Sequence, residues 1–141
     1  MKNIFFTSDH HFGHENILKF CNRPFSDIEE MNKVLINRWN EKIKPEDEVY
    51  HLGDFALMKD KEKLTEIIDK LNGTIFLIKG NHEGSALTVS KKFKWIKDYH
   101  ELKVKDAITH RTVLFSVAES MTVEVFFHKH AHIEYSRIPV Y

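Results

Sequence analysis

The stretch "KNIFFTSDHHFGH", residues 2–14, decides the fold, because it joins a short apolar run directly to a dense cluster of polar side chains. The apolar residues 4–6 predict a buried β-strand over residues 2–8. Side chains alternate across a strand and just beyond its end, so Asp9 and His11 point one way and His10 the other. The pattern therefore predicts that Asp9 and His11 face a common point.

Length and charge limit the kinds of protein that this chain can be. With 141 residues we expect one domain, residues 1–141, with its own hydrophobic core. The 21 basic and 21 acidic residues balance, which disfavours binding to long nucleic acid or to a membrane surface.

The chain opens without a signal-peptide pattern. Its lone cysteine, Cys21, excludes an internal disulfide and is expected to be buried on the first helix. We therefore expect a cytoplasmic protein.

Helices and strands alternate over the first two thirds of the chain. Apolar spacing and capping residues predict helices within residues 14–25, 26–47 and 59–73, and further strands within residues 47–54 and 74–84. This alternation predicts a doubly wound α/β sheet that binds its ligand beyond the carboxyl ends of the strands. After Trp95, three β-like runs (residues 99–106, 111–117 and 122–132) predict a second, mainly antiparallel layer.

Polar side chains follow each of the three predicted strands. Asp9 and His11 follow the first strand, Asp54 the second, and Asn81 and His82 the third. Taken singly, such residues are most often helix caps or turn residues. Together they offer carboxylate, imidazole and amide groups, which suit divalent ions such as Mn, Fe, Co, Ni or Zn. The combination predicts a metal centre.

The same motifs resemble a known family. D-x-H at residues 9–11, G-D at 53–54 and G-N-H-E at 80–83 resemble the calcineurin-like metallophosphoesterases, and most closely a small bacterial and phage-type phosphoesterase group. The resemblance implies an α/β fold in which two β-sheets form a sandwich flanked by helices. It also implies hydrolysis of a small phosphomonoester or phosphodiester by two divalent ions, with Mn favoured over Fe, Zn, Ni or Co.

The resemblance further implies a role for each residue. Asp9 and His11 look like ligands of the first metal, Asp54 like the bridging carboxylate, and Asn81 like a ligand of the second metal. A hydroxide bound by both metals would be the nucleophile. His82 resembles the histidine that stabilises the transition state or protonates the leaving oxygen. His82 and Asp54 are thus the expected catalytic residues.

The last third of the chain departs from the family pattern. Residues 116–118 are Ser-Val-Ala where the family has a histidine ligand of the second metal. In place of the family's G-H-x-H motif the chain has "KHAH", with Lys129 at the glycine position. His130 and His132 correspond to ligands of the second and the first metal. We therefore expect the second metal site to be the weaker one.

For four further histidines and one arginine, the sequence gives weaker support for a functional role. His110 or His128 could replace the missing ligand, although such residues are more often structural. His14 and Arg23 match the opening of the small group and are candidates to bind a substrate phosphate. The alternatives are a neighbour of a helix cap for His14 and a surface salt bridge for Arg23. His51 is expected to be a packed, hydrogen-bonded residue of its strand.

Two functions are compatible with these features. The first is a metal-dependent phosphohydrolase whose partner is a small phosphate ester, with no membrane and no long nucleic acid involved. The alternative is a catalytically weakened member of the same fold that serves as a binding scaffold, which the missing histidine favours. His82 favours the enzyme, because a scaffold has no use for a proton donor beside the metals.

Overall fold

The computed structural model describes residues 2–105, 112–118 and 124–125. In chain order the elements are β1 (Ile4–Thr7), α1 (Ile17–Phe20), α2 (Ile28–Lys42), β2 (Glu48–His51), α3 (Lys61–Asp69), β3 (Thr74–Ile78), α4 (Gly84–Leu87), the 3₁₀ helix η1 (Ser90–Lys92), β4 (Trp95–Lys97), β5 (Tyr99–Lys105), β6 (Thr112–Ala118) and β7 (Glu124–Val125). The predicted alternation of strands and helices is confirmed.

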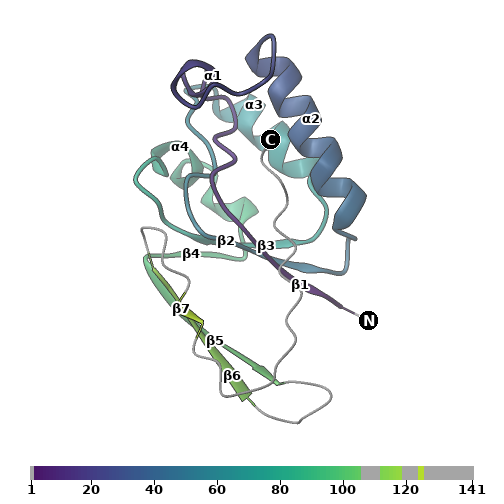
Figure 1. Ribbon diagram of the computed structural model, residues 1–141, viewed down its shortest axis with the longest axis vertical. Helices are drawn as coiled ribbons and strands as arrows, with labels where there is room; N and C mark the ends of the chain where they lie inside the picture. Colours follow the sequence, from purple (N-terminus) through teal and green to yellow (C-terminus); the bar gives the residue numbers. More distant parts are fainter. Residues whose placement is uncertain (1, 106–111, 119–123, 126–141) are drawn as a thin grey trace.

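The first sheet is parallel and has the strand order β1-β2-β3-β4. Its helices lie on one face, and the second sheet lies on the other (Figure 1). The prediction of a doubly wound sheet is therefore wrong. Right-handed connections between successive neighbours place every crossover on the same face, and this strand order has no point at which the direction reverses. The expected α/β sandwich of two sheets with helices is confirmed.

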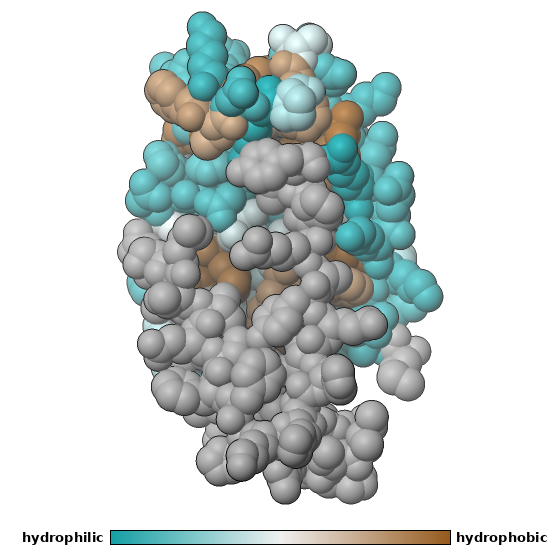
Figure 2. All heavy atoms as spheres, in the orientation of Figure 1, coloured by the Kyte–Doolittle hydropathy of each residue, from teal (hydrophilic) through white to brown (hydrophobic). Residues whose placement is uncertain are grey.

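One hydrophobic core fills the space between the first sheet and its helices. α2 begins at Asp27, whose side chain accepts a hydrogen bond from the backbone of Glu30. The core side chains come from the inner faces of α2, α3 and the central strands: Met31, Leu35, Trp39, Leu64, Ile67, Ile68, Val49, Ile75 and Leu77. Each contributes about 1.5–3 kcal/mol by leaving water. Figure 2 shows hydrophilic residues along the outer side of α2, as an amphipathic helix requires.

The second sheet is antiparallel, with the strand order β5-β6-β7, as predicted for the chain after Trp95. It meets the first sheet on the face opposite the helices. The ring of His100 on β5 stacks on Tyr50 of β2 at a centroid distance of 6.0 Å and lies 4.6 Å from the ring of Trp95. The metal-centre candidates lie outside this interface, beyond the ends of β1, β2 and β3.

Two smaller observations complete the fold. Cys21 is exposed at the C-terminal end of α1, so the prediction that it is buried is wrong, because α1 is only four residues long and its last turn faces solvent. None of the helices in the described part of the chain combines the length and the apolar character that crossing a membrane requires.

Candidate metal centre

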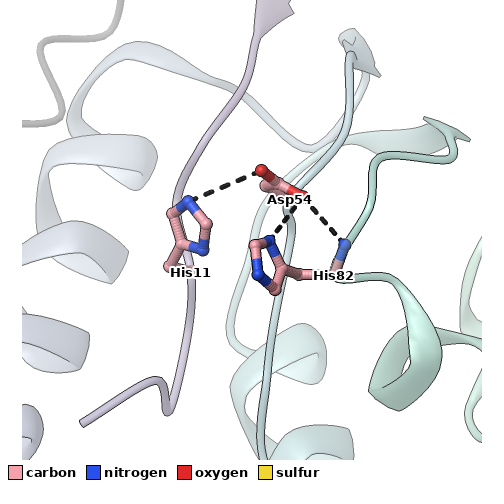
Figure 3. Close-up of side chains that lie close together, drawn as sticks. All are labelled: His11, Asp54 and His82. Carbon is pink, nitrogen blue, oxygen red and sulfur yellow. Dashed lines mark hydrogen bonds and ion pairs between the residues drawn. The ribbon is translucent and has the colours of Figure 1, made fainter. Parts of the chain in front are cut away.

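The loops that follow β1 and β2 run side by side beyond the sheet. The backbone nitrogen of Asp9 donates to the carbonyl of Gly53 (3.0 Å), and that of His11 donates to the carbonyl of Asp54 (2.9 Å). This pairing extends the parallel register of the two strands past their ends. His11, Asp54 and His82 consequently point toward one another from three separate segments (Figure 3).

Asp54 lies at the centre of this group. Its Oδ2 atom is 3.7 Å from Nε2 of His11, and its Oδ1 atom is 3.3 Å from Nδ1 of His82. One ligand atom from each of these three residues lies within 4.8 Å of the others, which is close enough for all three to hold one metal ion. Oδ1 of Asp9 adds a further oxygen 3.9 Å from Nε2 of His11. The two oxygens of Asp54 thus face different histidines, Oδ2 facing His11 and Oδ1 facing His82.

The Asn81 side chain completes the set of oxygen and nitrogen atoms. One end of its amide lies 3.1 and 3.2 Å from the two carboxylate oxygens of Asp54. With nitrogen at that end, the amide donates hydrogen bonds to the carboxylate. With oxygen there, three acceptor oxygens face one another, and only a cation between them stabilises that arrangement. Hydrogen bonding favours nitrogen at that end. Carboxylate, imidazole and amide groups gathered in one place are nevertheless of the kind that suits a divalent ion.

Burial keeps His11 in the form that binds metals. The residue is 6% exposed, and burial lowers its pKa to about 4, although the nearby Asp54 carboxylate raises it. The ring is thus neutral at pH 7 and can offer a lone pair. Its other nitrogen, Nδ1, lies 3.4 Å from Nδ1 of His14. Contacts of this kind orient a metal-binding imidazole.

His14 lies within the site. Its ring centroid is 5.4 Å from that of His11 and 5.7 Å from that of His82. Burial, followed by the nearby His82 and Arg23, lowers the pKa of His14. The structure therefore brings His14 into the group, whereas its contact with a substrate phosphate stays a prediction.

Three residues of the site have a strained backbone. The φ angles are +60° at Asp9, +53° at His11 and +56° at Asp54, in the left-handed region that residues other than glycine seldom adopt. Each such conformation costs on the order of 1–3 kcal/mol and persists only where the surroundings enforce it. Such strain concentrates at functional sites, so its coincidence with three candidate ligands supports a functional role for these loops.

Glu83 is a structural residue of the site that the sequence did not single out. It is 3% exposed, and its carboxylate accepts hydrogen bonds from the backbone nitrogens of Asp54 (3.0 Å), Phe55 (2.6 Å) and Gly80 (2.6 Å). Burial raises its pKa, while these hydrogen bonds lower it. Glu83 thereby ties the loop after β2 to the loop after β3. The signal available in the sequence was the acidic residue at the end of the G-N-H-E motif.

The comparisons with known proteins agree with this geometry. Residues 2–135 match the model of the calcineurin-like phosphoesterase family. The chain belongs to this family. The resemblance seen in the three motifs is thus confirmed at the level of the family.

Individual known proteins are also similar to part of the chain. The uncharacterized protein MJ1445 of Methanocaldococcus jannaschii is 52% identical over 84 residues, which are 59% of this chain and 48% of that protein. The Gene 66 protein of Mycobacterium phage L5 is 34% identical over 86 residues, 60% of this chain and 41% of that protein. The crystal structure of AQ665 from Aquifex aeolicus, a protein of unknown function, is 31% identical with a TM-score of 0.63, over 79% of this chain and 57% of that one. The chain thus matches about half or less of either curated relative.

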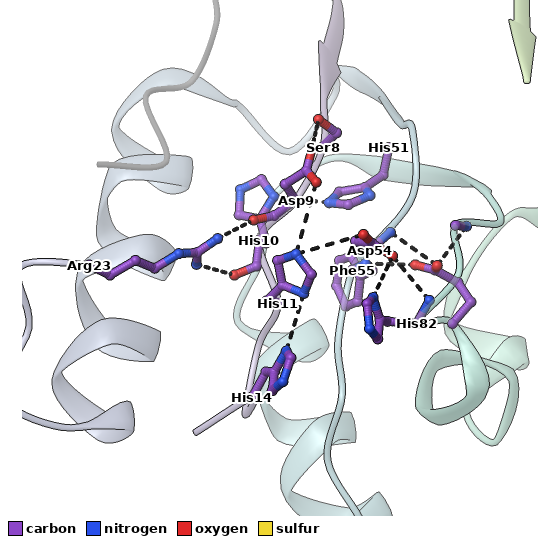
Figure 4. Close-up of polar contacts among 12 residues, drawn as sticks. Ser8, Asp9, His10, His11, His14, Arg23, His51, Asp54, Phe55 and His82 are labelled. Carbon is purple, nitrogen blue, oxygen red and sulfur yellow. Dashed lines mark hydrogen bonds and ion pairs between the residues drawn. The ribbon is translucent and has the colours of Figure 1, made fainter. Parts of the chain in front are cut away.

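His10 and His51 have no part in the group of candidate ligands. Both rings are fully buried behind the loop, and Nδ1 of His10 lies 2.9 Å from Nε2 of His51 (Figure 4). The prediction that His10 faces away from its neighbours Asp9 and His11 is confirmed. The expectation that His51 is packed and hydrogen-bonded is confirmed as well.

Arg23 is buried, which corrects the alternative of a surface salt bridge. The residue is 5% exposed, and its guanidinium donates to the backbone carbonyls of Asp9 (2.7 Å) and His10 (2.8 Å). The hydrogen bonds to these two carbonyls offset the cost of burying the charged side chain. A contact between Arg23 and a substrate phosphate stays a prediction.

The carboxyl-terminal candidates of this calcineurin-like phosphoesterase lie outside the described residues: His110, His128, Lys129, His130 and His132. Their predicted roles as ligands or replacements stay predictions. Residues 116–118, which lack the family's histidine, form the end of β6.

Proposed function

We propose that this calcineurin-like phosphoesterase is a metal-dependent hydrolase of small phosphomonoesters or phosphodiesters. The observation that carries the proposal is the group formed by His11, Asp54 and His82, in which one side-chain nitrogen or oxygen atom of each residue lies within 4.8 Å of the others at three strand ends. Membership of the family supports the same chemistry.

In this proposal Asp9, His11, Asp54 and Asn81 hold two divalent ions, Mn being favoured over Fe, Zn, Ni or Co. Such ions polarise the phosphate and lower the pKa of bound water. Asp54 contributes by presenting one oxygen to each side of the site. The second ion is the more weakly held one, because residues 116–118 supply no histidine.

His82 is the proposed proton donor. Its side chain is 36% exposed, so a substrate can reach it. A proton on Nδ1 hydrogen-bonds to Oδ1 of Asp54 at 3.3 Å, which leaves Nε2 as the atom that protonates the leaving oxygen. The positive ring also offsets the negative charge that develops on the phosphate.

The proposed substrate is a small molecule. The chain has no net charge and therefore lacks the long-range attraction that long nucleic acids exploit. His14, beside His11 and His82, is the proposed contact for a phosphate oxygen. A single cysteine is in keeping with a reducing compartment such as the cytoplasm.

The test is hydrolysis of chromogenic phosphate mono- and diesters by protein reloaded with Mn. We expect turnover that requires both Mn and Asp54, so the Asp54→Asn variant is inactive. Asp60→Asn is the matched control, because Asp60 is exposed, caps α3, and can be replaced by asparagine without loss of the cap.

The binding scaffold is the second candidate, favoured by the missing histidine at residues 116–118. It predicts metal binding without turnover. Absence of activity across a panel of metals and phosphate esters, in protein that binds Mn, would favour the scaffold over the enzyme.

A further inference from the structure

Arg23 contacts the loop that carries two of the candidate ligands. Arg23 follows α1, and its buried guanidinium donates to two successive backbone carbonyls, from Nη2 to that of Asp9 and from Nη1 to that of His10 (Figure 4). The planar guanidinium spans these two oxygens at once, which the single ammonium of a lysine cannot do in the same geometry. Arg23 therefore acts on the backbone of residues 9–10.

This backbone is held from both sides. On one side its N–H groups at Asp9 and His11 donate to the loop after β2. On the other side its carbonyls accept from Arg23. Between these contacts, Asp9 and His11 adopt left-handed φ angles of +60° and +53°, which a free loop would relax. Among the contacts of the described residues, Arg23 is the side chain that donates to the carbonyls of Asp9 and His10. We call this pair of hydrogen bonds the clamp.

We propose that Arg23 is a positioning residue that holds the Asp9–His11 turn in the conformation in which the Asp9 carboxylate lies beside His11 and the His11 ring faces Asp54. The inference rests on the proposed metal centre and goes beyond it, because it assigns Arg23 to the metal-binding loop and away from the substrate. In place of the contact with a substrate phosphate that the sequence suggested, Arg23 contacts the backbone carbonyls of the metal-binding loop.

Charge and positioning make opposite predictions for Arg23, which makes the proposal testable. A cation close to the centre repels a metal ion, so removal of its charge alone would strengthen metal binding. Loss of the clamp lets the turn relax and weakens metal binding. Residues that orient metal ligands typically change metal affinity by about 10- to 100-fold when they are replaced.

The experiment measures Mn affinity by calorimetry, and kcat and KM at saturating Mn, for wild type, Arg23→Gln and Arg23→Lys. Lys19→Gln is the control, because it removes an exposed positive charge from α1 four residues away. We expect Mn affinity about 10-fold weaker or more in both Arg23 variants, a KM close to wild type, and an unchanged Lys19→Gln.

Three results would overturn the proposal. Unchanged or tighter Mn binding with a KM raised tenfold or more would place Arg23 on the substrate. Wild-type protein that binds no Mn would remove the metal centre together with this role, whereas Mn binding that is equal in wild type and variants removes the role alone.

A measurement on the wild type covers the case in which a variant does not fold. The guanidinium NMR signals of Arg23 in Zn-loaded protein should show hindered rotation and stay unshifted when inorganic phosphate is added. Freely rotating signals that shift with phosphate would contradict a clamp on the backbone.

Discussion

Gly80 packs directly against Asp54: a β-carbon at residue 80 would lie 2.6 Å from both the backbone nitrogen and the Oδ1 atom of Asp54. The same β-carbon would lie 2.9 Å from Oε2 of Glu83. Asp54 and Glu83 therefore leave no room for a side chain at residue 80. The glycine of the G-N-H-E motif is required here for close approach.

Gly80→Ala should disrupt the site. The added methyl group must displace Asp54, so we expect Mn affinity to fall about tenfold or more and the free energy of unfolding to fall by about 1–3 kcal/mol. Calorimetry with Mn and urea unfolding measure the two effects. Gly84→Ala is the matched control, because a β-carbon there has no neighbour within 4 Å. Equal Mn binding by the two variants would contradict the close contact.

Glu83→Gln should separate the loops after β2 and β3. The carboxylate accepts three backbone hydrogen bonds, and the NH2 group of glutamine would face backbone donors. We expect the free energy of unfolding to fall by about 2–3 kcal/mol, with weaker Mn binding through the displaced Asp54. Urea unfolding is the measurement. Glu66→Gln, on the exposed side of α3, should leave the free energy of unfolding unchanged. An equal loss of stability in both variants would contradict the role of Glu83 in joining the two loops.

His82→Ala distinguishes a proton donor from a metal ligand. As proton donor, His82 contributes on the order of 10²–10⁴ to the rate, so kcat should fall by this factor while Mn affinity stays near that of wild type. As a ligand, it would lower Mn affinity at least as much as kcat. Steady-state kinetics at saturating Mn, together with Mn titration, separate these outcomes. A large loss of affinity would move His82 into the ligand set.

The buried pair His10 and His51 should make stability depend on pH. Burial lowers the pKa of His10 to about 3 and that of His51 well below its usual value, whereas both rings titrate near 6.5 in the unfolded chain. Below about pH 6.5 the unfolded state therefore binds more protons, and the free energy of unfolding falls as the pH decreases toward the folded pKa values. The loss approaches about 1.4 kcal/mol per pH unit for each ring.

Urea unfolding of metal-free protein between pH 7.5 and pH 5 measures this dependence. The double variant His10→Phe/His51→Phe removes both titrations and should show a shallower slope. His11, whose pKa is also lowered, keeps its own contribution in both proteins. A slope identical to that of wild type would show that the pair does not stay neutral in the folded state.

The sequence predicted the parts of the site that depend on strand order. Asp9, Asp54 and His82 each follow an apolar run, and parallel strands bring their carboxyl ends to one edge, so their proximity follows from the pattern alone. The direction of Arg23 does not follow from it. A lone arginine in "NRPF" gives no sign of burial, and its partners are backbone carbonyls that depend on how the turn folds.

A local sequence pattern also does not predict the left-handed backbone angles or the face of the sheet on which the helices lie. The left-handed φ angles at Asp9, His11 and Asp54 are uncommon for residues other than glycine, and tertiary hydrogen bonds hold them. The helices lie on one face because of the strand order, which the alternation of strands and helices leaves open. The second sheet covers the face that a doubly wound fold would give to helices.

Binding of Mn to the wild type and to Asp54→Asn, monitored by the electron paramagnetic resonance of free Mn, tests the metal centre most directly. We predict that the wild type and the Asp60→Asn control remove the signal of free Mn, and that Asp54→Asn binds at least about tenfold more weakly. An undiminished signal with the wild type, or equal binding by Asp54→Asn, would contradict a metal centre built around Asp54.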